Sequence, residues 1–543
     1  MEKVASADSK RSERTPSLSR VYSAPHVDNQ SAFYATSKGE DGQETDPVVP
    51  SYTAQDNQDL ENGNSGGGSD PDGDLQPTQT SRSQRSELDS KLVSWKGPND
   101  PENPKNWSMK RRWAAVFVVS CYTFISPVSS SMVAPDLTAI AKDLNIANGV
   151  ELEMTLSIFV LAYSIGPLFL GPLSEIYGRA IVLQLANLFF LVFNIACGVA
   201  QTKTQMIVFR FLAGLGGSAP LAIGGGVMSD CFRPEERGRA VAVYSLAPLL
   251  GPAVGPIAGG FIAENTTWRW CFYSTSILTG VIQFAGLFIL QETYGPKLLN
   301  RKAKNYAKKL KIHPGTPNMK TQVAPLPLSY QQLCAAPLFM AYIYGLMYLM
   351  LASFPTVWTG PDYYNESVGI GGLNYISLGL GFFIGSQISA RLIDLVYRRL
   401  KARNGGVGAP EFRTPLLGIG ALAIPIGLFI YGWTAEYRTH WIAPNIGAVI
   451  FSIGAIMTFQ CIQTYLVDSY TRYAASALAA ATVLRSLAGF GFPLFAQYMY
   501  SALHYGWGNS LLAFIGIGIG IPAPLLLWKY GAKLRAMSPF AAG

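Results

Sequence analysis

The groups whose chemistry stands out in this sequence are charges in or beside long apolar stretches. Glu175 and Arg179 lie four residues apart in GPLSEIYGR, so on a helical turn they share one face and can form an ion pair. Asp230 and Arg237 lie in a later polar connection. We interpret these residues as parts of one charge network.

Two arginines lie well inside apolar stretches, Arg210 and Arg485. A guanidinium held in lipid costs several kcal/mol unless it is paired or hydrated, so each must face a partner or a cavity. Arg485 lies about eleven residues into its stretch, or roughly 16 Å at helical rise, which places it near the midplane of a bilayer. For Arg485 we favour a structural pairing slightly over contact with a bound molecule.

Amide, phenol and indole side chains form a further group of candidates in the second part of the chain. Such groups suit the orientation of a ligand inside an otherwise apolar pocket. Each one alone is more often ordinary packing, so only the group as a whole is informative. The candidate residues of a substrate cavity are Tyr344, Tyr348, Trp358, Gln387, Gln460, Gln463, Tyr465 and Arg485.

Several other chemistries find no support in the sequence. The six cysteines occur singly, without the paired spacing of a disulfide framework or a zinc site. None of the four histidines lies in an apolar stretch beside an acidic partner, and no GxxxxGK[ST] phosphate loop occurs. We therefore expect no catalytic residue, no metal and no ATP-driven step. No carboxylate occupies the middle of an apolar stretch, so the sequence does not identify a proton acceptor.

The elements that would position these residues are membrane-spanning helices. The chain is 49% hydrophobic and 14% charged, a composition typical of membrane proteins. Apolar stretches of about 20 residues, the length that spans a bilayer, occur in two blocks of six. They lie near residues 113–135, 154–173, 180–200, 205–229, 240–263 and 270–291, and, after a polar interruption, near 337–359, 373–395, 415–434, 442–467, 474–502 and 508–529.

The basic residues are distributed unequally between the two sides of this arrangement. The odd-numbered connections carry only Lys142, Lys203, Arg269 and Arg438, whereas the even-numbered connections and the C-terminal segment are rich in Lys and Arg. By the positive-inside rule, both termini are then cytoplasmic. The net charge of +8 reflects this topology, and a nucleic-acid partner is not expected.

The composition divides the chain into six segments. They are a disordered cytoplasmic tail at 1–91, an amphipathic juxtamembrane segment at 92–112, a first six-helix half at 113–291, a basic cytoplasmic loop at 292–336, a second six-helix half at 337–530 and a cytoplasmic tail at 531–543. The first tail is too polar to offset the entropy of ordering. The aromatic and basic juxtamembrane segment suits the cytoplasmic headgroups. The basic loop is interpreted either as an amphipathic helix on the inner leaflet or as a solvated linker.

The stretch LAPLLGPAVGPIAGGF at Leu246–Phe261 combines glycines and prolines at a spacing of four. Its glycines would line one helix face, so another helix could approach at backbone contact. Its prolines each remove an amide donor and bend the helix. We therefore expect a kinked, tightly packed and central helix. The residues that define it are Gly251, Pro252, Gly255, Pro256, Gly259 and Gly260.

An internal repeat relates the two blocks. GPLSEIYGR, between the second and third stretches, aligns without gaps with ARLIDLVYR, between the eighth and ninth. The pairs are Gly171 with Ala390, Glu175 with Asp394, Gly178 with Tyr397, and Arg179 with Arg398. Two halves related by duplication are typical of transporters, with the substrate site at the bilayer midplane between them.

These motifs together resemble the major facilitator superfamily, in particular the fungal twelve-helix drug:proton antiporters. The resemblance covers about residues 92–535 and also rests on WRWCFY, ETYGPKLL, YAASALAAATVLRS and DPENPKNW. Glu175 stands where the family usually has Asp. The signatures of the superfamily and its antiporter branch are GPLSEIYGR (Gly171–Arg179), RFLAGLGGSAP (Arg210–Pro220), DCFRPEERGRA (Asp230–Ala240) and GPAVGPIAGG (Gly251–Gly260).

The resemblance implies a fold and a mechanism. The fold is an all-α membrane protein, the major facilitator fold, with twelve helices in two pseudo-symmetric halves. The activity is efflux of amphipathic drugs, toxins, polyamines or a self-made secondary metabolite, driven by the proton gradient without a cofactor. The alternative is a carrier of organic acids, polyamines or another small nutrient; sugar uptake is disfavoured because the doubled-Arg pattern of sugar porters is missing.

The resemblance also assigns roles to the motif residues. It implies that Arg210 tunes proton transfer and that the glycine and proline helix seals the pathway. A charged latch would join the cytoplasmic side of the first half to the eleventh stretch and favour the outward-facing state. The latch residues are Gly171, Glu175, Gly178, Arg179, Asp230 and Arg237, with Asp394 and Arg398 from the repeat.

The expected location is the plasma membrane, with the vacuolar membrane as the alternative, and the expected state is a monomer. NxS/T sequons occur at Asn29, Asn106, Asn265 and Asn365. Asn265 and Asn365 fall on the outer face, and Asn365 is the better glycan acceptor because Asn265 lies almost against the membrane.

Overall fold

The computed structural model describes residues 95, 99–309, 335–470 and 474–536. The expected tail at 1–91 lies outside the described residues, as do parts of the juxtamembrane segment, the basic loop and the C-terminal tail. The side chain of the latch candidate Arg237 also lies outside the described part.

Helices form both halves of the described chain. Each helix begins and ends close to an apolar stretch, because a membrane leaves no water to satisfy an irregular backbone. In the first half the crossing helices are α2 (Met109–Ser131), α4 (Gly149–Tyr177), α5 (Arg179–Gly198), α6 (Lys203–Gly217) with α7 (Ala219–Cys231), α8 (Pro234–Asn265) and α9 (Arg269–Ile289). In the second half they are α11 (Ala335–Thr359), α12 (Val368–Leu373) with α13 (Ile376–Arg403), α14 (Thr414–Glu436), α15 (Ile442–Ser469), α16 (Ala474–Gly520) and α17 (Pro522–Ala536).

The helical stretch at Ala477–Ala536 would cross a membrane twice. Its 60 residues would extend for about 90 Å, three times the thickness of the hydrocarbon core. The backbone of His504 is not helical (φ 56°), and the chain reverses there. Tyr500 accordingly stacks on Tyr505 at 4.3 Å between ring centroids, and its hydroxyl donates to Asn509 Oδ1 at 3.2 Å.

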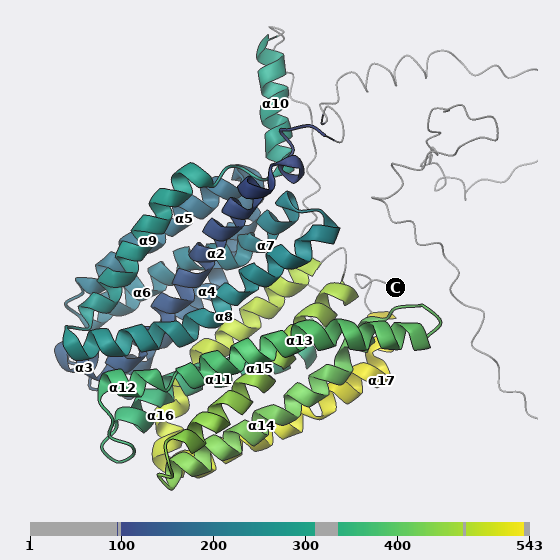
Figure 1. The fold of residues 1–543 in the computed structure, drawn as a ribbon. Coiled ribbons are helices and arrows are strands. Elements are labelled where there is room, and N and C mark those ends of the chain that lie inside the picture. The colour runs from purple at the N-terminus through teal and green to yellow at the C-terminus, as the bar shows by residue number, and fades with distance from the viewer. Residues whose placement is uncertain (1–94, 96–98, 310–334, 471–473, 537–543) are drawn as a thin grey trace, which may run out of the picture. The chain divides into compact units, whose positions relative to one another are not determined.

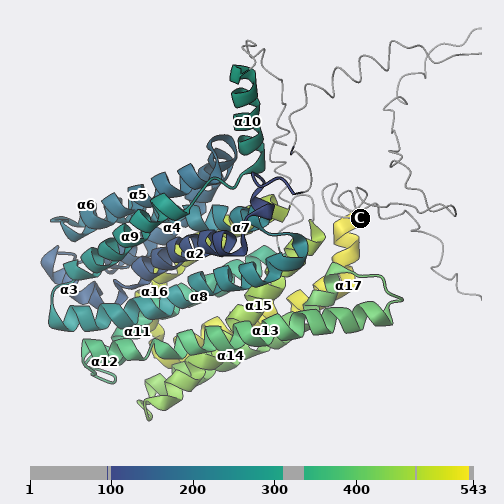
Figure 2. The same cartoon turned by 45° about the horizontal axis from the view of Figure 1, so that its top comes forward.

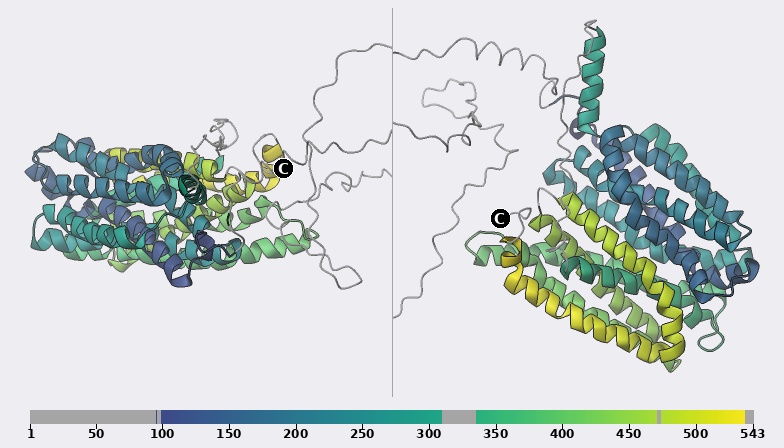
Figure 3. Two further views of the ribbon diagram at one scale, coloured as in Figure 1. Left: turned by 90° about the horizontal axis from the view of Figure 1, so that it is seen from above. Right: turned by 180° about the vertical axis from the view of Figure 1, so that it is seen from behind.

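The described residues contain eleven helical stretches long and apolar enough to span a membrane. Because the last of them crosses twice, they make twelve crossings in two blocks of six. The expected all-α architecture is thereby confirmed. Figure 1 and the reverse view in Figure 3 show the helices of the first half (blue to teal) and those of the second half (green to yellow) as two groups.

Alternation of the crossings defines two ends of the helix bundle. We call the end with the α4–α5 junction at Gly178 and the α7–α8 connection at Arg233 the basic end. The opposite end, with Asn265 and the connection at 360–367, is the far end. A short helix α3 (Leu137–Asp143) lies at the far end between α2 and α4.

Large apolar side chains cover the outside of the helices as well as their core. Phe284 and Phe288 on α9 are 66% and 70% exposed, and Trp507 and Phe514 of the second half are also exposed. A protein surrounded by water would rarely expose so many aromatic groups, whereas lipid solvates them. The exposed aromatics therefore support a bundle embedded in a bilayer.

The juxtamembrane segment is fastened to the first half. Trp107 follows the short helix η1 (Pro104–Asn106) and is buried in the core of the first half. Helix α10 (Gly295–Lys309) projects from the other helices (Figures 1 and 2). Its buried Lys302 donates to Asp100 Oδ2 at 2.7 Å, and this bond raises the pKa of Lys302. The segment thus packs on protein, and its contact with the headgroups stays a prediction.

Candidate functional site

A charge cluster at the basic end is built around Arg179. Its Nε atom lies 3.5 Å from Asp230 Oδ2, and its Nη2 atom lies 3.7 Å from Glu175 Oε1. Nη1 donates to Ser174 Oγ at 2.6 Å, and the guanidinium lies over the Tyr294 ring at 4.9 Å. The structure therefore brings together three residues of the expected charge network.

Glu175 and Arg179 do not share one helix, which differs from the sequence expectation. Helix α4 ends at Tyr177 and α5 begins at Arg179, with Gly178 between them at φ 99°. Side chains other than glycine rarely adopt this conformation. A Cβ atom at Gly178 would also overlap Glu292 Oε2. A glycine is thus required at position 178 by the backbone conformation of the turn and by the closeness of Glu292. Around Gly171, by contrast, there is open space.

Glu292, which the sequence reasoning did not single out, holds this turn in place. Its Oε1 accepts the backbone N–H groups of Arg179, Thr293 and Tyr294 at 2.9 to 3.1 Å. A carboxylate at the first turn of a helix accepts hydrogen bonds from unpaired amides and interacts favourably with the positive end of the helix dipole. Glu292 therefore ties the beginning of α5 to the chain that leaves α9.

The equivalent cluster in the second half uses a different arginine from the one expected. Arg413, at the end of the short helix η3 (Pro410–Arg413), donates to Asp394 Oδ1 and Asp468 Oδ2, both at 2.9 Å. Arg398 remains exposed on α13, and its Nε donates to the backbone oxygen of Asp394. The gap-free alignment paired Arg179 with Arg398; the structure places Arg413 in the equivalent role instead, because α13 continues to Arg403 and the polar connection intervenes.

The expected partner of the latch on the eleventh crossing is not among the described contacts. The ion pairs of Arg179 stay within the first half, and those of Arg413 stay within the second. Residues 471–473, just before α16, lie outside the described residues. The latch between halves thus stays a prediction.

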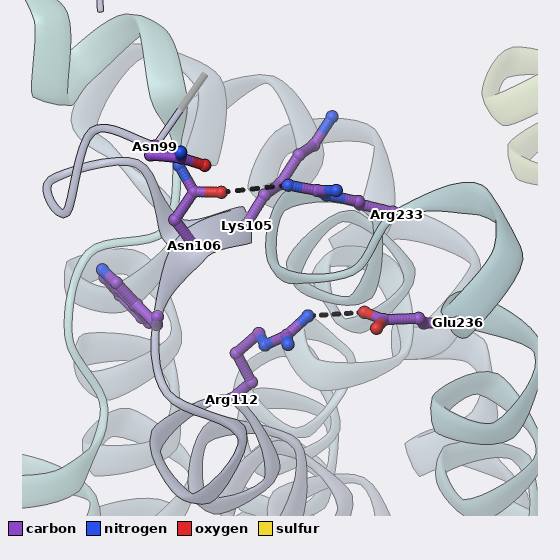
Figure 4. Close-up of a pocket in the computed structure, with 7 residues that line it drawn as sticks. Asn99, Lys105, Asn106, Arg112, Arg233 and Glu236 are labelled. Atoms are coloured by element: carbon purple, nitrogen blue, oxygen red, sulfur yellow. Dashed lines mark hydrogen bonds and ion pairs between the residues drawn. The ribbon is translucent and has the colours of Figure 1, made fainter. Parts of the chain in front are cut away.

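A second polar site at the basic end joins the juxtamembrane segment to the α7–α8 connection. It surrounds a pocket of about 370 Å³ (Figure 4). Arg112 Nη1 donates to Glu236 Oε2 at 2.6 Å, and Arg233 Nη2 donates to Asn106 Oδ1 at 3.3 Å. The motif DPENPKNW thereby packs against the motif DCFRPEERGRA.

The glycine face of α8 lies on α2. A Cβ atom at Gly255 would overlap Ser131 Oγ and lie 2.7 Å from the Val128 carbonyl oxygen. Equivalent atoms at Gly251 and Gly259 would also crowd α2. Helix α8 runs unbroken through Pro252 and Pro256. On an adjacent face, Gly260 approaches Val368 and Gly372 of α12, so this helix reaches both halves.

Arg210 is completely buried, with 0% exposure, and its hydrogen bonds end on main-chain oxygens. Nε donates to Thr155 at 2.9 Å, Nη1 to Ser129 at 2.9 Å, and Nη2 to Ser130 at 2.9 Å. A fourth, longer bond runs from Nη2 to Leu156 at 3.5 Å. Arg210 therefore fastens α6 to α2 and α4.

Arg485 has an entirely different environment. Its guanidinium lies between the rings of Tyr344 and Phe459, each 5.2 Å from the guanidinium carbon. Its buried Nε atom has no hydrogen-bond partner within the described chain. Tyr163 and Tyr244, which belong to the first half, lie within electrostatic range of it. No carboxylate of the described chain pairs with Arg485, so the structural pairing favoured from the sequence stays a prediction.

The other cavity candidates fall into three groups. Trp358 and Tyr465 are buried members of the second-half core. Tyr348 lies between the halves, since its hydroxyl is 3.5 Å from Ser130 Oγ, and its ring is 5.1 Å from that of Tyr344. The half-buried amides are Gln387, Gln460 and Gln463, of which Gln460 donates to Ser386 Oγ at 3.2 Å.

Five side chains define a central polar cluster: Tyr163, Tyr244, Tyr344, Tyr348 and Arg485. They come from both halves, and four are tyrosines. The sequence reasoning missed Tyr163 and Tyr244 because no single-stretch pattern distinguishes them from packing residues. The structure therefore adds first-half members to a site expected from the second half.

Glu153 is a buried carboxyl near the far end, and the sequence reasoning also missed it. It lies on the first turns of α4, is 8% exposed, and its Oε2 atom has no hydrogen-bond partner among the described residues. Tyr375 and Tyr505 of the second half lie within electrostatic range. By contrast, the buried carboxylate of Asp136 accepts from Cys271 Sγ at 2.9 Å.

The two sequons expected on the outer face both lie at the far end. Asn365 is exposed with φ 51° in the connection between α11 and α12. Asn265 is the last residue of α8, and its amide donates to the Phe261 oxygen at 2.8 Å. Asn106 lies at the basic end beside Arg233.

Comparison with known proteins agrees with this architecture. The family profile of the Major Facilitator Superfamily matches residues 119–493. The chain is 52% identical to the efflux pump vrtL of Penicillium aethiopicum, covering 84% of this chain and 92% of that protein. It is 41% identical to the efflux pump radE of Floropilus chiversii, covering 84% and 86%.

A solved structure supports the fold independently of sequence. The xylose transporter XylE of E. coli, in a partially occluded inward open conformation, superposes with a TM-score of 0.59 at 16% identity. The match covers 78% of this chain and 98% of that one. With two six-helix halves, a polar cluster between them and these relatives, the chain belongs to the Major Facilitator Superfamily and is a membrane transporter.

Proposed function

We propose that this protein exports amphipathic small molecules across a membrane in exchange for protons. The observation that carries this proposal is the similarity over most of the chain to proteins named as efflux pumps. The glycine face of α8, closely packed on α2, supports it because a helix junction of this kind excludes water and ions.

The contacts between the halves support a state closed at the far end. Glu264 Oε2 accepts the backbone N–H of Gly369 at 2.8 Å, and Gly260 adjoins Gly372. Close to the end of α2, Ser130 and Tyr348 also meet across the halves. The ion pairs described at the basic end stay within each half. Alternating access then requires the far-end contacts to part while the basic end closes.

Glu153 is the group that we assign to the coupling proton. An ionised carboxylate there would have no cation among the described residues to balance it, so the packed far end suits the protonated carboxyl. If the far-end contacts part, water reaches Glu153 and changes its preference between the protonated carboxyl and the ionised carboxylate. Protonation and the conformation of the far end are coupled in this way.

The basic end faces the cytoplasm in this proposal, and the membrane is the plasma membrane. The unequal distribution of Lys and Arg between the connections supports the orientation. Exposed Asn365 would then lie outside the cell.

A vesicle assay with the full chain tests the proposal. Vesicles with an acidic lumen are given anionic, neutral and cationic fluorescent amphiphiles, and empty vesicles serve as the control. We expect accumulation of at least one probe in the lumen and its loss when a protonophore collapses the gradient. Accumulation driven only by an alkaline lumen would show proton symport and overturn the proposed exchange.

A further inference from the structure

We propose that Arg485 binds an anionic oxygen group of the transported molecule, so that the preferred substrates are amphipathic acids: carboxylates, enolates or phenolates attached to a flat apolar body. This inference rests on the proposed function, because it assigns a substrate class to the same central polar cluster.

The first step is the contrast between the two intramembrane arginines. Arg210 satisfies its guanidinium with main-chain oxygens of three residues at 2.9 Å. Arg485 has no hydrogen bond or ion pair within the described chain, and its Nε is buried. A cation at this depth is costly to leave unpaired, and structural arginines are paired as Arg210 is. The N–H donors of Arg485 are therefore available to a bound molecule.

The second step is that no neighbour of Arg485 in the described chain accepts a hydrogen bond from its Nε atom. Ring faces attract the charge but leave its five N–H donors unsatisfied. The Tyr163 hydroxyl is engaged with Ser126 Oγ at 2.5 Å. The Tyr244 hydroxyl donates to the Pro220 oxygen at 2.9 Å. Both hydroxyls are thus hydrogen-bonded to partners in the first half.

The third step is the position of the second-half carboxylates, which are engaged elsewhere. Asp394 and Asp468 bind Arg413, and Glu411 binds Arg535 at 3.0 Å. Glu436 accepts the backbone N–H of Tyr505, and Glu366 accepts from Asn374. None of these second-half carboxylates pairs with Arg485, and no ion pair joins Arg485 to any other carboxylate of the described chain. The missing negative charge is then supplied from outside the chain.

The fourth step is the apolar surface beside the guanidinium. Tyr344 and Phe459, whose rings lie 5.2 Å from the guanidinium carbon, are partly buried side chains that pack against the second-half core. Aromatic faces next to a cation suit a planar molecule whose acidic group meets the guanidinium while its body lies on the rings. A small hydrated ion would gain nothing from these rings.

Equilibrium binding to the purified full chain tests this inference. The probes are pyrenebutyrate, a carboxylate, and its neutral amide, and binding is followed by energy transfer from tryptophan to pyrene. We expect the wild-type chain to bind the acid about tenfold more tightly than the amide, the magnitude of a charge-assisted hydrogen bond. Arg485→Gln should lower the affinity for the acid to that for the amide, and Arg485→Lys should retain part of the preference.

Arg403→Gln is the matched control, because it removes the same charge from an exposed site at the end of α13. It should leave both affinities unchanged. If Arg485→Gln does not fold, the preference of the wild-type chain and the behaviour of Arg485→Lys still decide. Equal binding of acid and amide by the wild-type chain would overturn the inference, as would an unchanged preference in Arg485→Gln.

Three further results separate the possible failures. Displacement of pyrenebutyrate when chloride replaces gluconate at equal ionic strength would assign the site to an inorganic anion and overturn the inference. Selective binding of the acid by a chain that moves no probe in vesicles would refute the proposed export and leave the anion site standing. Export of probes without any preference for the acid would refute the anion site and leave the proposed export standing.

Discussion

Arg413 occupies in the second half the place that Arg179 occupies in the first. Each arginine lies at the beginning of the third crossing of its half and pairs with carboxylates from the second and fourth crossings. The pairing distances are 2.9 Å around Arg413 and 3.5 to 3.7 Å around Arg179. The duplication therefore preserves an ion-pair geometry while changing the sequence position that provides the cation.

This relationship predicts that Arg413→Ala impairs the protein more than Arg398→Ala. Arg413 holds two carboxylates, and its loss should cost about 1 kcal/mol or more of the free energy of unfolding. Arg398 is exposed and bonds to a backbone oxygen of its own helix. The melting temperature in detergent, with transport in vesicles, checks the difference. Equal effects of the two substitutions would contradict the assigned equivalence.

The cluster around Arg179 predicts a change of conformational balance. Glu175→Ala and Arg179→Ala should lower transport several-fold at matched expression, since a pair worth about 1 kcal/mol shifts a two-state population about fivefold. The fold should survive, because the cluster lies at the end of the helices. Unaltered transport in both variants would show that these charges set topology only.

The packing of α8 on α2 predicts that Gly255→Leu abolishes export. The Cβ atom alone would overlap Ser131 Oγ, and overpacking costs about 1 to 3 kcal/mol. Gly280→Leu on α9 is the matched control, since a Cβ atom there meets nothing within 4 Å. Vesicle transport and proton leak are measured for both. Normal export by Gly255→Leu would show that the junction is not needed.

The position of Glu153 predicts the pH behaviour of the transporter. Glu153→Gln mimics the protonated carboxyl permanently, so accumulation driven by a pH gradient should fall to the level of empty vesicles. Counterflow of a labelled probe, which needs no net proton movement, should continue. Glu151→Gln is the control, because Glu151 is partly exposed and already pairs with Lys203 at 2.7 Å. Gradient-driven accumulation that persists in Glu153→Gln would assign the proton to another group.

The exposed sequon predicts the orientation of the chain. Glycan should be found on Asn365 and removed by Asn365→Gln, as seen by a mass shift after glycosidase treatment. Asn265 is a weaker acceptor because its amide caps the end of α8. Glycan on Asn106, at the basic end, would reverse the proposed topology.

The crossings could be predicted from the sequence because lipid imposes a simple rule: a helix must be apolar for about 20 residues. The role of Arg413 could not be predicted from the sequence, because it depends on where α13 ends and on the path of the connection from α13 to α14. A gap-free alignment has no access to that geometry. The sequence also showed that Gly251, Gly255 and Gly259 form a packing face, but only the structure identifies α2 as the helix they meet.

The candidate site was predicted in part. Arg485 and Tyr344 were identified because polar groups inside apolar stretches are costly and therefore informative. Tyr163 looks like any aromatic packing residue until its neighbour across the two halves is known. Glu153 was overlooked because it lies near the end of a stretch, where a carboxylate is unremarkable, and its burial is visible only in the folded protein.

The anchoring of Arg210 has a consequence for how such a transporter changes over evolutionary time. Its hydrogen bonds within the described chain end on main-chain oxygens, which every amino acid supplies. Mutation at Ser129, Ser130 or Thr155 therefore leaves the acceptor atoms in place. Three helices stay joined while the side chains near their junction are free to vary, so new specificities can arise without rebuilding the scaffold.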